Sequence, residues 1–374
     1  MKCVCISCFD YYDIRMKKIL QFFQDKNFDT TYIISDFNHF SKSYNDKECK
    51  YENTYKIHVP SYNKNLSVKR LYSHMYFSKK VYEKIVEIEP DIIYCIFPPN
   101  MLVRELDRYK KNHKSKVILD RYDTWPESFP VGKYERLLKI PFSIWRNLRD
   151  KHIDVADLLI TVCEKGKIEC NEKYPDKITK VLYPYIEPGM IPLYTFDVEE
   201  EITFGYLGNI NFITNIPLLT NFLYEVSKYK KVVLHIIGGG QKLDELVDSL
   251  KNENIKVISH GPIFDEEKKN EIFSECDFGL NLPYEKINSA MALKYIEYLK
   301  VGLPIINSGV GDNYYITKEN KVGFNINEDS IESLAKKLVK LSSEDINTIH
   351  NNCLLVYRNK FVEQKFEEIF KNIL

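Results

Sequence analysis

The sequence predicts an α/β protein of two domains, each a doubly wound parallel sheet with helices on both faces. Short apolar segments alternate with longer amphipathic ones along the whole chain, which is typical of such sheets. The chain has 374 residues, enough for about two domains of roughly 100–200 residues each. Four residues interrupt the alternation and mark the expected boundary near residue 190: Pro184, Pro188, Gly189 and Pro192.

The first half opens with a β-α-β pattern and then alternates apolar and amphipathic segments. Ligands of parallel sheets bind beyond the carboxyl ends of the strands, so the residues that follow each strand are the candidates for a site. Strands are expected at residues 2–8, 31–35, 55–59, 91–97, 117–119 and 157–162, and helices at 12–26, 66–88, 133–153 and 164–174.

The second half repeats the alternation, and it ends in helical segments. Expected strands cover residues 202–207, 232–237, 257–263, 278–282, 304–306 and 322–324, and expected helices cover 266–276, 290–300, 331–341 and 345–373. Glycines follow two of these strands, at Gly208 and at 238–240, and glycine lets the backbone approach a ligand closely.

The segment 284–307 reads as a loop, a helix, a glycine stop and a strand. Asn288 or Ser289 suits the N-cap, because a short side-chain oxygen accepts from the free first-turn N–H groups. Gly302 suits the left-handed stop and Pro304 prevents continuation. The amino end of such a helix can hold a phosphate.

Lys294 and Glu297 lie three residues apart in this helix and therefore share a face. Lys294 would add a positive charge beside a phosphate, and the Glu297 carboxylate could accept hydrogen bonds from two ribose hydroxyls. The alternative is an exposed ion pair on an ordinary helix, which contributes little.

Residues 294–304, KYIEYLKVGLP, resemble the K-x-x-E-Y-L-x-x-G-x-P signature of glycosyltransferase family 4. The resemblance implies the GT-B fold, with two Rossmann-like domains, a nucleotide diphosphate sugar as co-substrate, retention of anomeric configuration and no bound metal or other cofactor. It also implies the domain roles: acceptor binding for residues 1–190, nucleotide-sugar binding for 191–360, and a C-terminal helix, 361–374, that crosses back to the first domain.

The donor site follows from the same resemblance. Glu297 matches the second of two family glutamates separated by seven residues, which holds the ribose, whereas Ser289 stands at the first. The family often has an Arg and a Lys after the strand at 202–207; this chain has Asn209, Asn211 and Thr214. The expected donor-binding set is Gly208, Asn209, Gly238, Gly239, Pro262, Ile263, Ser289, Ala290, Met291, Ala292, Lys294 and Glu297.

Residues 120–128, DRYDTWPES, resemble the family's D-x-W-P-E segment. Asp123 is a catalytic candidate together with Lys294, and Tyr122 stands where the family often has a histidine. Arg15 matches the D-x-R opening of many members, so Arg15, Tyr122 and Trp125 are the expected acceptor-binding residues. The alternatives are that Asp123 caps a turn, Trp125 packs in a core and Arg15 merely begins a helix.

Charge is balanced overall but divided unevenly. The chain has 53 Lys and Arg and 53 Asp and Glu; residues 1–190 carry 33 basic and 26 acidic side chains, net +7, and the remainder 20 and 27, net −7. A basic half suits an anionic partner. Basic and aromatic residues in the helix 66–88, among them Arg70 and His74, and in the run 108–116 could dock on an anionic membrane surface. For each run taken alone, a solvated helix face is the favoured alternative. No nucleic-acid partner is expected.

Nine cysteines are scattered, and the three near the start are followed by no second pair at zinc spacing, so no metal site is expected. The odd count without a signal peptide indicates reduced thiols in the cytoplasm. No run of about 18 apolar residues suggests a spanning helix, so an association with the inner face of the membrane would be peripheral.

We therefore expect a cytoplasmic hexosyltransferase that acts on a saccharide, lipid-linked in surface polysaccharide (capsule) synthesis. P-loop, G-x-S-x-G and H-E-x-x-H motifs are absent from the sequence. Two alternatives stay open: a catalytically impaired partner or chaperone of another transferase, which Ser289 favours, and a nucleotide-sugar epimerase.

Overall fold

A computed structural model describes residues 1–45, 51–127, 135–194, 196, 200–285, 291–362, 366–371 and 373. Two compact units make up the chain, Met1–Leu182 with Lys365–Leu374 and Tyr183–Gln364. The expected boundaries near residues 190 and 360, and the roles given to the domains, stay predictions.

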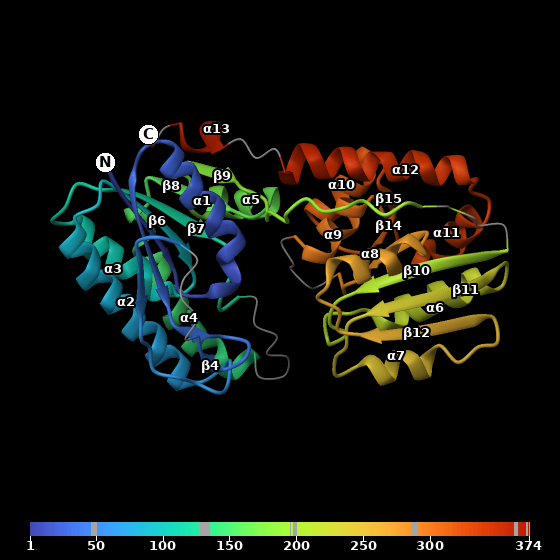
Figure 1. The fold of residues 1–374 in the computed structure, drawn as a ribbon. Coiled ribbons are helices and arrows are strands. Elements are labelled where there is room, and N and C mark those ends of the chain that lie inside the picture. The colour runs from blue at the N-terminus through green and yellow to red at the C-terminus, as the bar shows by residue number, and fades with distance from the viewer. Residues whose placement is uncertain are drawn as a thin grey trace. The chain divides into compact units, whose positions relative to one another are not determined.

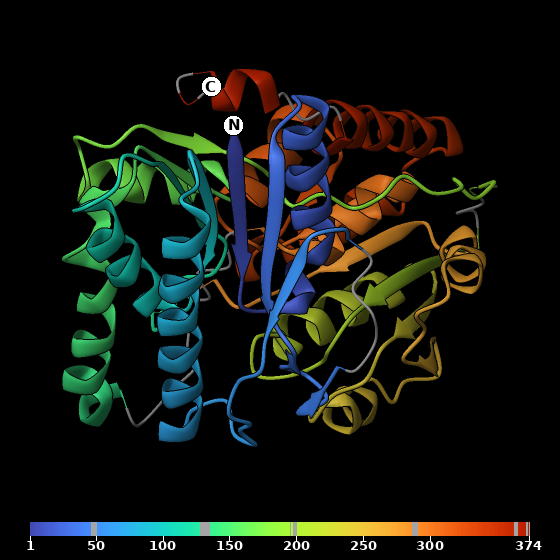
Figure 2. The same cartoon turned by 60° about the vertical axis from the view of Figure 1, so that its left-hand side comes forward.

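The first unit contains a parallel sheet in the order β5-β2-β1-β6-β7-β8-β9, seven strands among the described residues. Strands β1 and β2 pair from Lys2↔Asp29 to Ser7↔Ile34 and lie side by side in Figure 2. The strands are β1 (Lys2–Ser7), β2 (Asp29–Ser35), β5 (Thr54–Ile57), β6 (Ile92–Phe97), β7 (Lys116–Arg121), β8 (Leu158–Thr161) and β9 (Thr179–Val181), besides the short antiparallel pair β3 (Phe37–Asn38) and β4 (Ser43–Tyr44). The helices are α1 (Asp13–Asp25), α2 (Val68–Ile88), α3 (Asn100–Lys110), α4 (Glu135–Asp150), α5 (Glu164–Lys173) and α13 (Phe366–Phe370).

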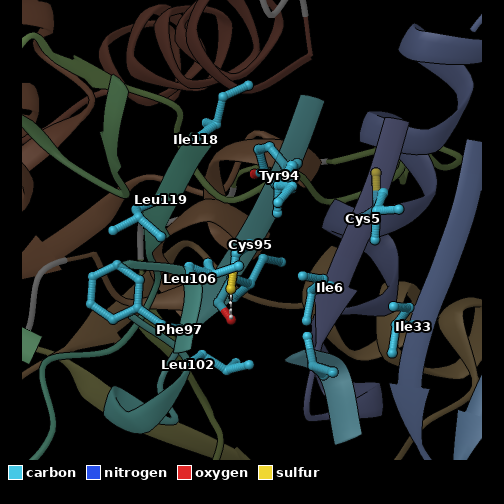
Figure 3. Packing of buried hydrophobic residues seen from close by; sticks show 14 of the residues in the cluster. Cys5, Ile6, Ile33, Tyr94, Cys95, Phe97, Leu102, Leu106, Ile118 and Leu119 are labelled. Carbon is cyan, nitrogen blue, oxygen red and sulfur yellow. Dashed lines mark hydrogen bonds between the residues drawn. The ribbon is translucent and has the colours of Figure 1, made fainter. Parts of the chain in front are cut away.

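Apolar side chains cover both faces of this sheet, as expected for parallel strands that lie between helices. Figure 3 shows Ile6, Cys95 and Leu119 of three strands packed with Leu102 and Leu106 of α3. The eight described cysteines are buried free thiols. In Figure 1, α2 and α3 lie next to each other.

Helix α13 completes the core of the first unit from the other end of the sequence. The Phe370 ring is buried, and its centroid lies 5.2 Å from that of Phe22 and 5.7 Å from that of Phe23. Phe22 and Phe23 belong to α1, so α1 and α13 pack together.

The second unit has a parallel sheet in the order β12-β11-β10-β13-β14-β15, six strands among the described residues. Its first strand, β10, lies in the middle, and the strand order reverses between β10 and β13, where ligands of such sheets bind. The strands are β10 (Glu201–Leu207), β11 (Lys231–Ile237), β12 (Ile255–Gly261), β13 (Phe278–Asn281), β14 (Ile305–Asn307) and β15 (Gly323–Asn325). The helices are α6 (Ile216–Ser227), α7 (Leu243–Ser249), α8 (Glu266–Ser274), α9 (Leu293–Val301), α10 (Asp312–Asn320), α11 (Ile331–Leu338) and α12 (Ser343–Val356).

These sheets confirm the predicted fold class of two doubly wound α/β domains. The single last helix expected over 345–373 is wrong, because α12 ends at Val356 and a π-helical turn, Tyr357–Val362, separates it from α13. The chain passes from the second unit to the first over this stretch.

Candidate functional site

Glycine backbones form the carboxyl ends of β10, β11 and β12 in the second unit. Gly208, Gly238 and Gly261 have φ of +113°, +145° and +69°, values that side chains disfavour. The Gly208 N–H donates to Ile237 O at 2.9 Å and the Gly238 N–H to Gly261 O at 2.8 Å. A Cβ on Gly238 would lie 2.0 Å from Gly208 O, so the two loops touch through bare backbone.

The space in front of these loops is open in two places. A Cβ added to Gly239 or Gly261 would meet no heavy atom within 4 Å. Pro262 is exposed and Ile263 is half-buried directly after β12, and Asn209 is exposed after Gly208. These predicted donor-binding residues therefore gather at one edge of the sheet.

Two other polar residues of the Gly208 loop serve the fold instead. The Asn211 side chain accepts from the Ile213 N–H at 2.9 Å, and the buried Thr214 hydroxyl lies 2.9 Å from the Tyr206 hydroxyl. The Thr214 hydroxyl and the Asn211 carbonyl oxygen are therefore engaged within the loop, and neither residue supplies the charge of the family's pair.

Helix α9 begins later than the sequence predicted. Its N-cap is Ala292, which has an extended backbone and no side-chain cap, so the N-cap expected at Asn288 or Ser289 is wrong. The helical hydrogen bonds start there, since the N–H of Tyr295 donates to Ala292 O at 3.0 Å. Met291 is buried beside it, and Ser289 and Ala290 lie outside the described residues.

Lys294, in the first turn of α9, reaches the Gly208 loop. Its Nζ lies 3.9 Å from the centroid of the buried Tyr206 ring and 3.7 Å from the position of a Cβ on Gly208. In the described part of the chain no carboxylate forms an ion pair with Lys294. The first-turn N–H groups that Ala292 does not cap and the Lys294 ammonium thus offer positive charge beside bare backbone, which suits a phosphate.

Glu297 lies one turn further along α9. Its Oε2 accepts from Lys269 Nζ of α8 at 3.4 Å, and its side chain is 18% exposed. The alternative of an exposed ion pair between Lys294 and Glu297 on an ordinary helix is wrong. Glu297 is largely buried and pairs with Lys269 of α8 instead. The sequence analysis did not single out Lys269. The available signal was its spacing of three residues from Glu266 in α8.

Asp123, in the first unit, follows β7 and lies next to residues that follow β1. The Tyr12 hydroxyl donates to Asp123 Oδ2 at 2.5 Å, and the Tyr11 hydroxyl lies 3.5 Å from the same oxygen. Burial raises the pKa of Asp123 above its usual value, although both tyrosines and the charge of Arg70 oppose the rise. Tyr11 and Tyr12 were not predicted, although aromatic residues directly after a strand were a signal for them.

Trp125 and Tyr122 border the same group of side chains. The Arg70 guanidinium lies 4.0 Å from the Trp125 ring centroid, and its Nε donates to His74 Nε2 at 3.4 Å. The Tyr122 ring lies 4.5 Å from the Tyr12 ring, between centroids. An aromatic surface with a carboxylate beside it can bind a saccharide through ring contacts and hydroxyl hydrogen bonds.

Two expectations about basic residues need correction. Arg15 is buried and donates through Nε and Nη2 to Asp120 at 2.6 and 2.9 Å and through Nη1 to Leu182 O at 2.6 Å. This bonding is structural, so we leave Arg15 out of the acceptor site. Arg70 and His74 do not belong to an exposed basic face of α2, because both are buried.

Two further observations concern metals and membranes. Within the described ranges, no group of three or more His, Cys, Asp or Glu side chains is arranged to hold a metal ion. None of the described helices is both long and apolar enough to cross a bilayer.

Comparison with solved structures identifies the architecture. Sucrose-phosphate synthase from Thermosynechococcus elongatus is 11% identical with a TM-score of 0.72, over 100% of this chain and 97% of that one. The lipopolysaccharide outer core galactosyltransferase WaaB is 15% identical with a TM-score of 0.67, and Anabaena Alr3699/HepE in complex with UDP and glucose is 13% identical with a TM-score of 0.64, both over 100% of the two chains compared. At these identities the likeness shows the fold, and the fold is GT-B.

The second unit also matches a known family. Residues 201–344 match the model of the family described as glycosyl transferases group 1, so the second unit carries a domain of this type. The match includes the motif at 294–304 and confirms the resemblance that this motif predicted. No curated protein matches the sequence significantly.

Proposed function

We propose that this chain transfers a hexose from a nucleotide diphosphate sugar to a saccharide hydroxyl, with retention of configuration. The observation that carries the proposal is the position of Lys294, whose ammonium lies beside Gly208 at the uncapped start of α9. A diphosphate there would meet backbone N–H groups, the positive end of the helix and one ammonium. The Alr3699/HepE structures that share this fold hold UDP or UDP-glucose.

The chemistry of the donor side follows from charge. Breaking the bond between sugar and diphosphate leaves negative charge on the diphosphate, and groups that already point at that charge lower the barrier. Lys294 and the amides near Gly208 would supply this stabilisation without first reorganising. The Glu297 carboxylate would accept from the ribose hydroxyls and fix the nucleoside.

On the acceptor side, we propose that Asp123 accepts a hydrogen bond from the hydroxyl that attacks, with the rings of Trp125 and Tyr122 against the saccharide. The hydroxyls of Tyr11 and Tyr12 hold Asp123 in one orientation. A raised pKa brings a carboxylate closer to the range in which it can take up a proton.

Binding of nucleoside diphosphates tests the donor site. We expect UDP, GDP or ADP to raise the melting temperature of the chain. Lys294→Met and Glu297→Gln should each weaken the preferred nucleotide by about 1.5–3 kcal/mol, roughly 10- to 150-fold in Kd, because each removes a charge-assisted hydrogen bond. Isothermal titration calorimetry measures the Kd values.

Lys318→Met is the matched control. The Lys318 Nζ also lies over a tyrosine ring, 5.9 Å from the centroid of Tyr314, but Lys318 belongs to α10 and not to the proposed donor site. No binding of any nucleoside diphosphate, or equal losses in Lys318→Met and Lys294→Met, would contradict the donor site.

A second candidate is a catalytically impaired partner of another transferase. The observation in its favour is Ser289, at the position of the family's first glutamate. Release of free sugar from a nucleotide sugar, abolished by Lys294→Met, would refute the partner function. Tight nucleotide binding with no turnover alone or with lipid-linked acceptors would support it.

We propose an anionic membrane surface as a further partner, where the acceptor is lipid-linked in surface polysaccharide assembly. Three apolar side chains of α4 are strongly exposed, Leu137, Ile140 and Ile144 at 76%, 72% and 62%. They recur at helical spacing, and the exposed Arg136 and Lys139 lie between or beside them. An apolar stripe flanked by basic residues suits the surface of an anionic bilayer.

Vesicle binding tests this surface. The triple variant Leu137→Ser, Ile140→Ser, Ile144→Ser should bind phosphatidylcholine vesicles with 30% phosphatidylglycerol about tenfold or more weakly in co-sedimentation, because each apolar side chain loses the gain from leaving water. Phe264→Ser with Leu193→Ser removes two apolar side chains of the second unit that are even more exposed, at 92% and 94%, and should bind like the unchanged chain. Equal losses in the two variants would contradict the assignment to α4.

A further inference from the structure

Four charged side chains of α8 and α9 alternate in sign along a chain of ion pairs. Glu297 Oε2 lies 3.4 Å from Lys269 Nζ, and Lys269 Nζ lies 3.4 Å from Glu266 Oε1. Glu266 in turn accepts from Lys300 Nζ with both oxygens at 2.7 Å. Each helix contributes one glutamate and one lysine three residues apart, so the two helices are joined reciprocally.

Three of the four side chains are largely withdrawn from solvent, whereas Glu266 is 47% exposed. The side chains of Lys300 and Lys269 are 3% and 10% exposed. A Cβ on Gly189 would lie 2.7 Å from Glu266 Oε2 and 3.1 Å from Lys300 Cε, so the chain closes over the outer end of the network. Burial would raise the pKa of Glu266, but the hydrogen bonds and charges of Lys300 and Lys269 outweigh it and lower that pKa.

A glutamate side chain has several rotatable bonds, and a carboxylate that must hold two hydroxyls needs a fixed orientation. Lys269 donates one hydrogen bond to Oε2 of Glu297, which leaves Oε1 and the remaining lone pairs of both oxygens free to accept from other donors. Glu266 keeps Lys269 in place from the other side, and Lys300 balances the charge of Glu266.

We infer that Lys269 is a positioning residue that orients the Glu297 carboxylate for the two hydroxyls of the donor's ribose, with Glu266 and Lys300 as its support. This inference rests on the proposed function and adds a source of selectivity to it: the site distinguishes ribose from 2′-deoxyribose through a carboxylate that a lysine of another helix holds. Lys269 itself does not touch the nucleotide.

The experiment compares each of UDP, GDP and ADP with its 2′-deoxy counterpart by calorimetry. The unchanged chain should bind the preferred ribonucleotide about tenfold or more tightly than the deoxy form, because the missing hydroxyl leaves a carboxylate oxygen without its donor. In K269M this preference should fall to about twofold or less, and E297Q should show the same fall. K269R should retain most of the preference, since its guanidinium can reach both glutamates.

K268M is the matched control, because Lys268 is the exposed neighbour on α8 and lies outside the network. It should keep the full preference. If K269M does not fold, K269Q, which keeps a hydrogen-bond donor of similar length, takes its place.

Two outcomes separate the inference from the function on which it rests. A ribose preference that K269M and K269Q leave unchanged would overturn the positioning role while the donor site stands. Absence of nucleotide binding, or of any ribose preference, in the unchanged chain would overturn the donor site and the inference together. A loss of affinity equal for both nucleotides in K269M would show a merely structural lysine and would also overturn the inference.

Discussion

Replacement of Asp120 by asparagine is expected to destabilise the first unit by about 3–5 kcal/mol, because it leaves the buried Arg15 charge without its counter-ion. The side chains of Arg15 and Asp120 are 3% and 0% exposed. Tyr94 also donates to Asp120 from the neighbouring strand. The carboxylate thus joins α1, β6 and β7 in the middle of the sheet.

Urea unfolding followed by tryptophan fluorescence measures this effect. The chain has two tryptophans, Trp125 and Trp145, and both belong to the first unit, so their emission reports that unit. Replacing both partners, as in Arg15→Met with Asp120→Leu, should recover much of the loss, since two apolar groups need no counter-ion.

Lys80→Met is the control for this series, because the Lys80–Glu83 pair lies on the surface of the same unit, and it should leave the midpoint unchanged. A loss below about 1 kcal/mol for Asp120→Asn would contradict a structural role for this pair and would return Arg15 to the candidates for acceptor binding.

Replacement of Gly238 by alanine is expected to destabilise the second unit strongly. The φ of +145° alone costs a non-glycine residue about 1–3 kcal/mol, and the new Cβ would lie 2.0 Å from Gly208 O and 2.8 Å from Gly208 C. Because both contacts are backbone atoms, the loops after β10 and β11 must move apart. The predicted phosphate site at Gly208 should be lost with them.

Gly239→Ala gives this variant a control one residue away, since its Cβ would meet no heavy atom within 4 Å. Far-UV circular dichroism should show a lower melting midpoint for Gly238→Ala and an unchanged one for Gly239→Ala, with tryptophan emission from the first unit unchanged in both. Calorimetry should show a Kd for nucleoside diphosphates raised about tenfold or more in Gly238→Ala. Gly239 belongs to the predicted donor-binding set, so this control concerns stability alone. Equal melting midpoints for the two variants would contradict the close contact between the loops.

Residue spacing predicted the features that depend on neighbours in the sequence. The alternation of apolar and amphipathic segments indicated both doubly wound sheets, and the three-residue spacing of Lys294 and Glu297 placed them on one face of α9. The glycines after β10 and β11 were candidates because bare backbone follows a strand end. These signals are local, so an unfolded chain already contains them.

Other features depended on contacts between distant residues. Arg70 and His74 were expected on a basic face of α2. In the structure they continue the buried side of this helix with Phe77, Val81 and Ile85. The apolar spacing was visible in the sequence, but the charge of Arg70 argued against burial. The start of α9 was misplaced because capping preference favoured Asn288 and Ser289, whereas the helix begins after Ala292.

By itself, therefore, the sequence determined the fold class, the helix that carries Lys294 and Glu297, and the family resemblance that this helix bears. Only the tertiary structure decided that Arg15 pairs with Asp120, that Lys269 holds Glu297 and that Lys294 lies over Gly208. The physical reason is that strand and helix formation follow from side chains a few residues apart, whereas ion pairs and close backbone contacts require segments that the chain brings together only when the sheets have formed.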